Sequence, residues 1–170
     1  MKSPIGPIVS SAHLASGALP ALSEFEFGLI LATHAFSRWI VRAMTAAGFP
    51  GLNSLDVMIL HAVNHRDRAK RLADICLVLN VEDTHLVTYA LKKLEQAGLV
   101  KSGRQGKEKT VAITARGQEA CARYRDIREE LLVKPLKALG LGGEALSGIA
   151  AEMRALSGHY DQAARAAASL

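Results

Sequence analysis

The segment spanning residues 71–98 constrains the fold most, because it reads as two short helices joined by a tight turn. One face of the first helix carries apolar side chains at Leu72, Ile75, Cys76 and Leu79. Asn80 follows, and asparagine tolerates the left-handed backbone that a tight turn requires. The second helix ends at Gly98 and has predicted inward-facing residues at Leu86, Ala90, Leu91 and Leu94. This order of elements is typical of a helix-turn-helix.

A β-hairpin with a basic tip is predicted directly after the second helix. Apolar residues mark its two strands at Leu99, Val100, Val111 and Ile113. Between residues 98 and 117, one acid, Glu108, stands against basic residues at Lys101, Arg104, Lys107, Lys109 and Arg116. A helix-turn-helix followed by such a hairpin is a winged helix, in which a basic tip suits phosphates or a minor groove of DNA. The alternative is a solvated hairpin whose charges only protect an exposed edge.

Three groups of residues are candidates for DNA contacts. Base edges are expected to meet the exposed side of the second helix, at Thr84, His85, Thr88, Tyr89 and Lys92. The hairpin tip contributes Arg104, Gln105, Lys107 and Lys109. Phosphates are also expected to meet the residues before the first helix, at Arg66, Arg68, Lys70 and Arg71. For each of these residues the alternative is a simple exposed side chain.

Composition is consistent with a globular DNA-binding protein. The chain of 170 residues is 49% hydrophobic and carries a formal charge of +5, which favours a polyanionic partner. The first 20 residues lack the apolar core of a secretory signal, and no run approaches the roughly 18 apolar residues of a membrane span. Cys76 and Cys121 are too far apart for a disulfide framework or a zinc knuckle. A reducing cytoplasm fits this pattern best.

Long helices are predicted on both sides of a winged helix-turn-helix domain at residues 53–114. Residues 1–20 read as a flexible arm, and residues 21–52 as a helix with its connector, started by a capping box of Ser23 and Glu26. This helix is apolar around most of its surface, which indicates a partner subunit. The next helix is expected to start at Asn53 or Ser54 and to end near His65.

The C-terminal region, residues 115–170, gives a second indication of a dimer. Thr114 is placed to cap a helix that is interrupted by Pro135 and the glycine cluster of Gly140, Gly142 and Gly143. Beyond it, spacings of three and four residues form a coiled-coil-like seam at Leu146, Ile149, Met153, Leu156, Tyr160 and Ala163. The seam folds back on its own chain or packs in a twofold dimer, which we favour. A dimer presents two reading helices about 34 Å apart and predicts a pseudopalindromic site in double-stranded DNA.

Two motifs flank the hairpin. The first is L-x-x-L-E-x-x-G-L-V, formed by Leu91, Leu94, Glu95, Gly98, Leu99 and Val100. The second leads into the next helix through Ile113, Thr114 and Gly117. Both resemble motifs of the MarR family of bacterial winged-helix transcription regulators, over roughly residues 22–165. The chain departs from that family where an Asp-x-Arg pair braces the wing, since Gly106, Lys107 and Glu108 stand near that place.

The resemblance implies a mainly α fold with a small β-hairpin and long N- and C-terminal dimerisation helices. It also implies a homodimeric transcription regulator, most often a repressor, that releases DNA when a small aromatic or anionic effector binds. A polar pair on a mostly buried helix, His34 and Arg38, is the first candidate for that effector, joined by Trp39, Thr45 and His61. The alternative is that His34 and Arg38 reach solvent or bond across the dimer.

Other function classes are weakly represented. We expect no cofactor and no catalytic activity, because the chain has no Gly-rich phosphate loop after a strand. His61 and His65 are spaced to share a metal ion, but they lack a further ligand in the pattern, so we predict no metal site. Cys121 leaves redox sensing open. A winged helix that serves as a protein-interaction module without DNA is the remaining alternative.

Overall fold

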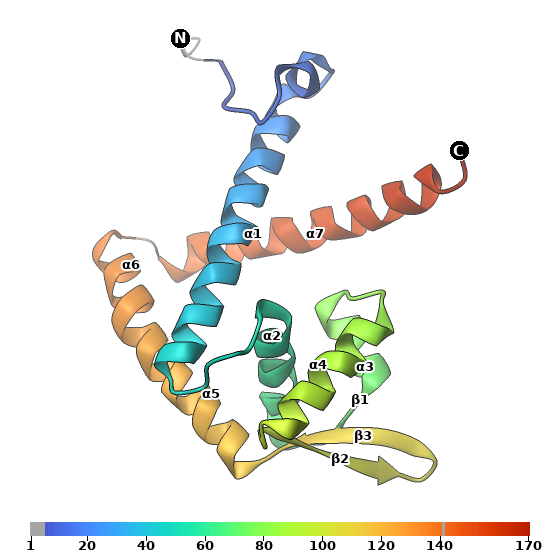
Figure 1. Ribbon diagram of the computed structural model, residues 1–170. Helices are drawn as coiled ribbons and strands as arrows, with labels where there is room; N and C mark the ends of the chain where they lie inside the picture. The colour runs from blue at the N-terminus through green and yellow to red at the C-terminus, as the bar shows by residue number, and fades with distance from the viewer. Residues whose placement is uncertain (1–5, 141) are drawn as a thin grey trace. The chain divides into compact units, whose positions relative to one another are not determined.

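The computed structural model describes residues 6–140 and 142–170, which fall into two units divided after Arg125. The first unit holds a 3-10 helix (Ala12–Ser16), α1 (Pro20–Ala46), α2 (Ser54–Asn64), a 3-10 turn (His65–Asp67), β1 (Lys70–Arg71), α3 (Leu72–Leu79), α4 (Thr84–Gln96), β2 (Val100–Gln105), β3 (Glu108–Ile113) and most of α5 (Ala115–Arg128) (Figure 1). The second unit continues with a π-helical turn (Glu129–Val133), α6 (Lys134–Ala138) and α7 (Gly143–Ala167). The predicted mainly helical class with a small hairpin is confirmed.

The start of α1 differs from the prediction. The helix begins at Pro20, and proline suits the first turn because its missing N–H would have no helical partner there. Ser23 consequently lies inside the helix, where its buried Oγ has no hydrogen-bond partner among the described residues. The predicted capping box of Ser23 and Glu26 is therefore wrong. The first five residues of the predicted flexible arm lie outside the described residues.

The central helix of the first unit is α2, which packs against α1, α3, α4 and β3. It starts as predicted at Asn53, whose Oδ1 accepts from the Asp56 N–H at 2.9 Å while Asp56 Oδ2 accepts from the Asn53 N–H at 2.8 Å. This reciprocal capping box satisfies two N–H groups at the helix start. The helix buries Val57, Ile59, Leu60 and Val63 completely.

The predicted helix-turn-helix is confirmed in α3 and α4. Asn80 between them adopts the left-handed conformation, with φ 51° and ψ 46°. Asp83 caps α4 by accepting the His85 N–H at 2.8 Å. The inward stripe of α4 is Val87, Ala90 and Leu94, all buried, whereas Leu86 is 53% exposed. The predicted inward position of Leu86 is thus wrong, because neighbouring residues of a helix point about 100° apart.

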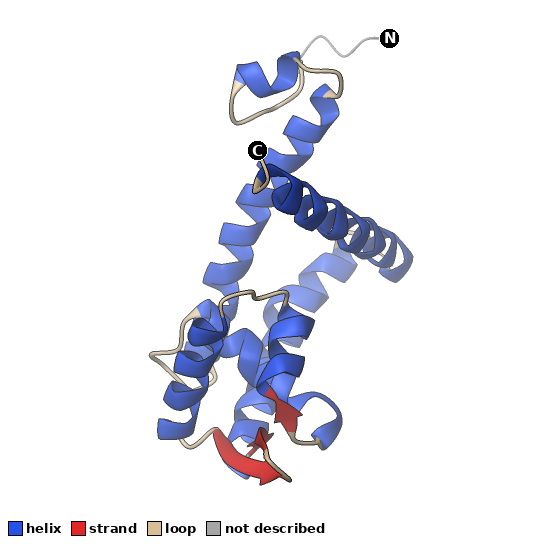
Figure 2. Cartoon of the chain, turned by 90° about the vertical axis from the view of Figure 1, so that its right-hand side faces the viewer, coloured by secondary structure: helices blue, strands red, loops and turns tan. Residues whose placement is uncertain are grey.

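The described strands form an antiparallel sheet in the order β1-β3-β2. The predicted hairpin is present as β2 and β3, and Gly106 in its turn has φ 63°. The sequence did not predict the short strand β1, which belongs to the connector of residues 65–71 between α2 and α3. It pairs Lys70 with Val111 and Arg71 with Thr110 of β3. Figure 2 shows the strands together at one end of the first unit. The connector therefore anchors the hairpin to the start of α3.

A threonine joins the hairpin to the helices on either side. Thr114 Oγ1 lies 2.7 Å from the Gly98 carbonyl and 3.0 Å from the Leu99 carbonyl, and it accepts the Gly117 N–H at 3.0 Å. The predicted cap of α5 is therefore formed by Thr114. The same hydroxyl ties the start of α5 to the residues that follow α4.

The second unit is helical throughout α6 and α7. Of the residues predicted to interrupt the helical run, Pro135 does not end it, whereas the glycine cluster does, because α6 ends at Ala138 just before Gly140. Pro135 occupies the first turn of α6, where its missing N–H is tolerated, directly after the π-helical turn Glu129–Val133. The chain then turns at Gly140, with φ 75°. Within the described chain, α7 buries none of its side chains. Among the described residues, no helix has the length and apolarity that crossing a bilayer demands.

The close packing around Thr114 yields a stability prediction. A Cβ at Gly117 would lie 2.1 Å from the Leu99 carbonyl oxygen and 2.6 Å from Ile113 Cδ1. Gly117→Ala forces α5 away from the hairpin, and we expect the free energy of unfolding to fall by about 1–3 kcal/mol in urea titrations. The control is Gly28→Ala in α1, where a Cβ meets nothing within 4 Å. Equal stability of the two variants would contradict this packing.

Candidate nucleic-acid interface

The exposed side of α4 carries the residues predicted to read bases. Thr84, His85 and Lys92 are exposed, and Tyr89 is 69% exposed. Thr88 is half-buried, and its Oγ1 donates to the Thr84 carbonyl at 2.9 Å, which leaves its methyl and its oxygen lone pairs for other contacts. The structure thus brings these predicted side chains to one surface, and all of them are polar except for the tyrosine ring.

One residue of this surface was missed from the sequence. Leu86 stands one helical turn before Tyr89 and is exposed despite its apolar side chain. An exposed leucine beside an exposed tyrosine suits contact with a thymine methyl group. The signal that could have found it is the spacing of Val87, Ala90 and Leu94, which defines the inward stripe without Leu86.

The tip of the hairpin concentrates positive charge in solvent. The predicted contacts there, Arg104, Gln105, Lys107 and Lys109, are all exposed. Arg104 lies directly opposite Lys109 in the β2–β3 register. Like charges in such a cross-strand pair repel and destabilise the hairpin. A polyanion bound at the tip would relieve that repulsion.

Arg71 braces the hairpin against α3. Its Nη2 lies 2.9 Å from Asp74 Oδ1, and its Nη1 lies 3.4 Å from Glu108 Oε2 on β3. The hydrogen bond from Arg71 holds the pKa of the Asp74 carboxyl below its usual value. The hairpin has no Asp-x-Arg brace of the kind that the family resemblance implies, and the Arg71–Glu108 pair makes a link to the wing instead. Arg71 is therefore engaged with two carboxylates, but its side chain is 51% exposed, and its predicted phosphate contact stays a prediction.

Lys70 requires a correction. It is only 8% exposed, and its ammonium donates to the carbonyls of His65 and Arg68. A buried ammonium held in this way stabilises the connector and is not available to DNA, so the predicted phosphate contact of Lys70 is wrong. Arg66, with φ 60°, and Arg68 are exposed on the same connector. They remain candidates for phosphate contacts.

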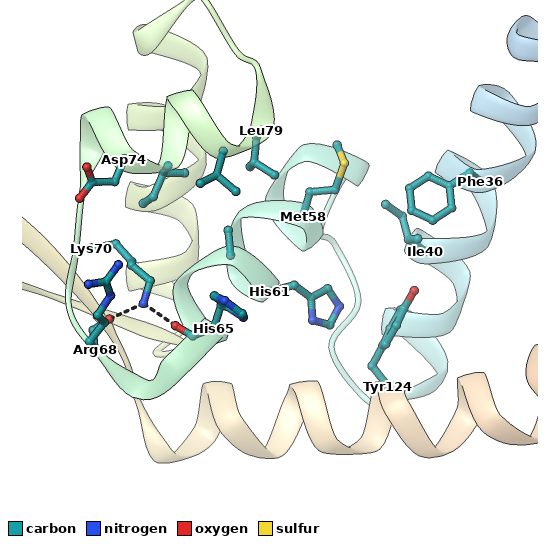
Figure 3. A pocket seen from close by; sticks show the side chains of 13 residues that line it. Phe36, Ile40, Met58, His61, His65, Arg68, Lys70, Asp74, Leu79 and Tyr124 are labelled. Atoms are coloured by element: carbon teal, nitrogen blue, oxygen red, sulfur yellow. Dashed lines mark hydrogen bonds between the residues drawn. The ribbon is translucent and has the colours of Figure 1, made fainter. Parts of the chain in front are cut away.

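A cavity of about 510 Å³ lies in the first unit between α1, α2, α3 and α5. Figure 3 shows aromatic residues at one end, Phe36 and Tyr124, and charged residues at the other, Arg68, Lys70 and Asp74. The remaining lining is Ile40, Met58, His61, Ala62, His65, Ile75, Val78 and Leu79. An apolar chamber with a charged end is suited to an amphipathic small molecule.

His61 stands in the middle of the cavity wall. Its ring packs edge-on against Tyr124 with centroids 4.6 Å apart, and its Nε2 is buried with no hydrogen-bond partner among the described residues. Burial lowers the pKa of His61, since an imidazolium is poorly solvated there. A neutral His61 with a free ring nitrogen is ready to hydrogen-bond a bound ligand.

The other predicted effector residues do not line this cavity. Arg38 lines a separate hollow of about 560 Å³ beside the start of α2. Thr45 Oγ1 donates to the Val41 carbonyl at 2.9 Å, and His34 is exposed. Trp39 is half-buried and is likewise absent from the lining of the cavity. The prediction followed the polar stripe of α1, whereas the cavity meets the apolar side of that helix, at Phe36 and Ile40.

Metal and redox chemistry find little support in the described residues. No group of three or more His, Cys, Asp or Glu side chains there could hold a metal ion, and His61 packs on Tyr124. Both cysteines are buried as free thiols. Burial raises the pKa of the Cys121 thiol to about 11. At neutral pH it is therefore a thiol and not the reactive thiolate.

Comparison with known proteins agrees with this geometry. Residues 52–117 match the family model described as a winged helix DNA-binding domain, so the chain contains a domain of that class. No curated protein is significantly similar to the chain in sequence. Over 83–84% of the chain, the fold is that of MarR-family regulators, as the sequence motifs predicted.

Three similar solved structures illustrate the match. NMB1585, a MarR family regulator from Neisseria meningitidis, is 17% identical with a TM-score of 0.66, over 84% of this chain and 95% of that one. CouR from Rhodococcus jostii RHA1 bound to p-coumaroyl-CoA is 15% identical with a TM-score of 0.61, over 78% of this chain and 90% of that one. NadR in complex with 4-hydroxyphenylacetate is 18% identical with a TM-score of 0.60, over 76% of this chain and 89% of that one.

The buried His61 yields a prediction of pH-dependent stability. Its pKa is lowered from 6.5 in the folded chain, so the unfolded chain binds a proton that the folded chain resists. The free energy of unfolding should therefore fall as pH drops below about 6.5, with no contribution from this group above that value. We compare urea titrations at pH 7.5 and 5.5, about one unit on either side of that value. The free energy of unfolding should fall less between these two pH values in His61→Gln than in the wild-type protein. A control variant at the exposed His159, His159→Gln, should keep the wild-type decrease, and a full decrease in His61→Gln would contradict the assignment.

Proposed function

We propose that this protein is a homodimeric, sequence-specific DNA-binding transcription regulator, and that it is a repressor released by a small-molecule effector. The observation that carries the proposal is the like-charged pair of Arg104 and Lys109 at an exposed hairpin tip beside the exposed face of α4. Such a tip is costly for the free protein, and a bound polyanion would offset that cost. The winged helix DNA-binding domain match supports the same conclusion.

In this proposal α4 enters the major groove while the hairpin tip follows the flanking backbone. The base-reading residues are Thr84, His85, Thr88, Tyr89 and Lys92, to which Leu86 is now added. The phosphate contacts come from Arg104, Gln105, Lys107 and Lys109 at the tip, and from Arg66 and Arg68 on the connector. Side chains of these kinds divide naturally into groups that read base edges and groups that fix the register on the backbone.

Exposed apolar faces on both end helices support the homodimer. In α1, Ile30, Leu31 and Phe36 are 47%, 55% and 53% exposed. In α7 the predicted seam residues Leu146, Ile149, Met153 and Tyr160 are between 37% and 55% exposed. Large apolar side chains gathered on helix faces indicate contact with another chain. A twofold dimer would then pair two copies of α4 with a pseudopalindromic operator.

The cavity is the proposed effector site. Its aromatic end at Phe36 and Tyr124 would hold a ring, and Arg68 would meet an anionic group at the other end. CouR and NadR, which share the fold, were each solved with a ligand that combines a phenol ring and an anionic group. A small aromatic anion is accordingly the effector class that we propose here, with His61 as its hydrogen-bond partner.

The proposal places the protein in the bacterial cytoplasm, as a regulator and not an enzyme. Its buried reduced thiols and its proposed partner, chromosomal DNA, fit that compartment. A protein-interaction module without DNA binding is the competing function. Binding to duplex DNA at two salt concentrations separates the two directly.

The salt dependence of DNA binding tests the proposed interface. Each phosphate contact contributes about 0.9 to the slope of log affinity against log salt. Arg104→Ala combined with Lys107→Ala should weaken binding to all duplexes and reduce that slope by about 1–2. Tyr89→Ala should instead change sequence preference and leave the slope unaltered.

The control for the hairpin variant removes the same charge elsewhere. Lys137 lies in α6 and Arg154 in α7. The variant that combines Lys137→Ala with Arg154→Ala should keep the wild-type slope of log affinity against log salt. Gel-shift titrations on a duplex enriched from a random library supply the affinities. An unchanged slope in the hairpin variant would remove the wing from the interface, and absence of duplex binding at low salt would favour the interaction module.

Ligand binding tests the effector site. We expect 4-hydroxyphenylacetate to raise the melting temperature, because a ligand that binds only the folded state stabilises it. Tyrosol, its neutral alcohol analogue, should raise it less, since it lacks a charge for Arg68. Ala62→Phe fills the cavity and should abolish the shift. An equal shift with both compounds, or a full shift in Ala62→Phe, would contradict the assignment.

A further inference from the structure

Two adjacent lysines of α4 have different surroundings. Lys92 is exposed on the face proposed to read bases. Lys93, the next residue, is half-buried, and its Nζ lies 2.7 Å from Asp56 Oδ2. Asp56 belongs to the first turn of α2 and is completely buried. The second lysine therefore joins the recognition helix to the central helix of the unit instead of facing DNA.

The Asp56 carboxylate makes this link demanding. Its Oδ2 accepts from both the Lys93 ammonium and the Asn53 N–H, while its Oδ1 is buried with no hydrogen-bond partner among the described residues. A buried carboxylate is strongly destabilising unless a counter-charge and hydrogen bonds compensate it. Lys93 provides the counter-charge, so departure of its ammonium is costly. The bond holds α4 in one place along α2.

Apolar packing alone would hold α4 less specifically. Val87 and Leu94 press the helix against its neighbours, but contacts of this kind are non-directional. A charge-assisted hydrogen bond has a preferred direction and length. Lys93 stands one turn after Tyr89, so the bond fixes the rotation of the helix close to the exposed tyrosine. A rotation of α4 about its own axis would turn Tyr89 and Lys92 away from the base pairs that they are proposed to read.

We infer that Lys93 is a positioning residue for DNA recognition, which sets sequence specificity through the buried Asp56 and makes no phosphate contact of its own. The inference rests on the proposed function. A lysine that contacts phosphate would change both the affinity for DNA and its dependence on salt, whereas a positioning lysine would change only the sequence specificity. Loss of the Lys93–Asp56 bond lowers the ratio of specific to non-specific affinity, and it leaves the salt slope unchanged.

The test variants are chosen so that folding is preserved. Lys93→Met alone leaves the Asp56 carboxylate buried without its counter-charge, which can unfold the domain. The combination of Asp56→Asn and Lys93→Met removes both charges and keeps an acceptor for the Asn53 N–H. Lys93→Arg retains a cation within reach of Asp56 and serves as the rescue. Lys92→Met is the matched control, since it removes the same charge one residue away.

Affinity is measured by gel shift on a duplex enriched from a random library with the wild-type protein, and on a scrambled duplex, at several salt concentrations. We expect the double variant to lose about tenfold in the ratio of the two affinities, comparable to one lost base contact, with the wild-type salt slope. Lys93→Arg should keep the wild-type ratio. Lys92→Met should shift base preference at one position, because Lys92 is placed among the base-reading residues.

The outcomes distinguish the inference from the proposed function. A folded double variant with the wild-type ratio overturns the positioning role of Lys93. A reduced salt slope in that variant also overturns it, because Lys93 would then contact phosphate. Failure of the wild-type protein to enrich any duplex would overturn the proposed function itself, and the inference would fall with it.

Discussion

The hydroxyl of Thr114 is the contact on which the arrangement of the winged helix depends. It bonds the carbonyls at residues 98 and 99, directly after α4, and it accepts the Gly117 N–H at the start of α5. The Thr114 N–H also donates to the Leu99 carbonyl at 3.1 Å. The close approach of Gly117 to Leu99 leaves no room for a side chain. Recognition helix, hairpin and following helix therefore meet at one fixed junction, which sets the angle between α4 and the wing.

The central helix α2 connects the two parts of the proposed function. Residues 56 and 58 of this helix point about 160° apart, because each residue advances about 100° around the axis and two steps make about 200°. Asp56 faces α4, whereas Met58 and His61 line the cavity. The cavity and the recognition helix thus lie on opposite sides of one rigid element. A ligand that displaces α2 has a direct mechanical route to the DNA-reading surface.

Much of this architecture could be predicted from the sequence, because it rests on local signals. These signals depend only on residues that are close together in the chain. They include the turn at Asn80, the Asn53–Asp56 capping box and the apolar ends of the hairpin. The errors at Lys70 and in the effector site came from long-range contacts, whereas those at Ser23, Leu86 and Pro135 lay within local patterns that were misread. Lys70 is buried because β1 joins β3 across about forty residues of chain, a pairing that no local pattern shows. The lining of the cavity depends on which side of α1 faces α2 and α5, and the polar stripe of that helix pointed to the wrong side.

The central claim is that two copies of the chain bind one DNA duplex. Hydroxyl-radical footprinting of the protein on an enriched duplex, with the stoichiometry read from the same complex by light scattering, tests that claim most directly. The account predicts two protected stretches on one side of the duplex, about 10 base pairs apart, and two chains per complex. A single protected stretch with one chain per complex would contradict it.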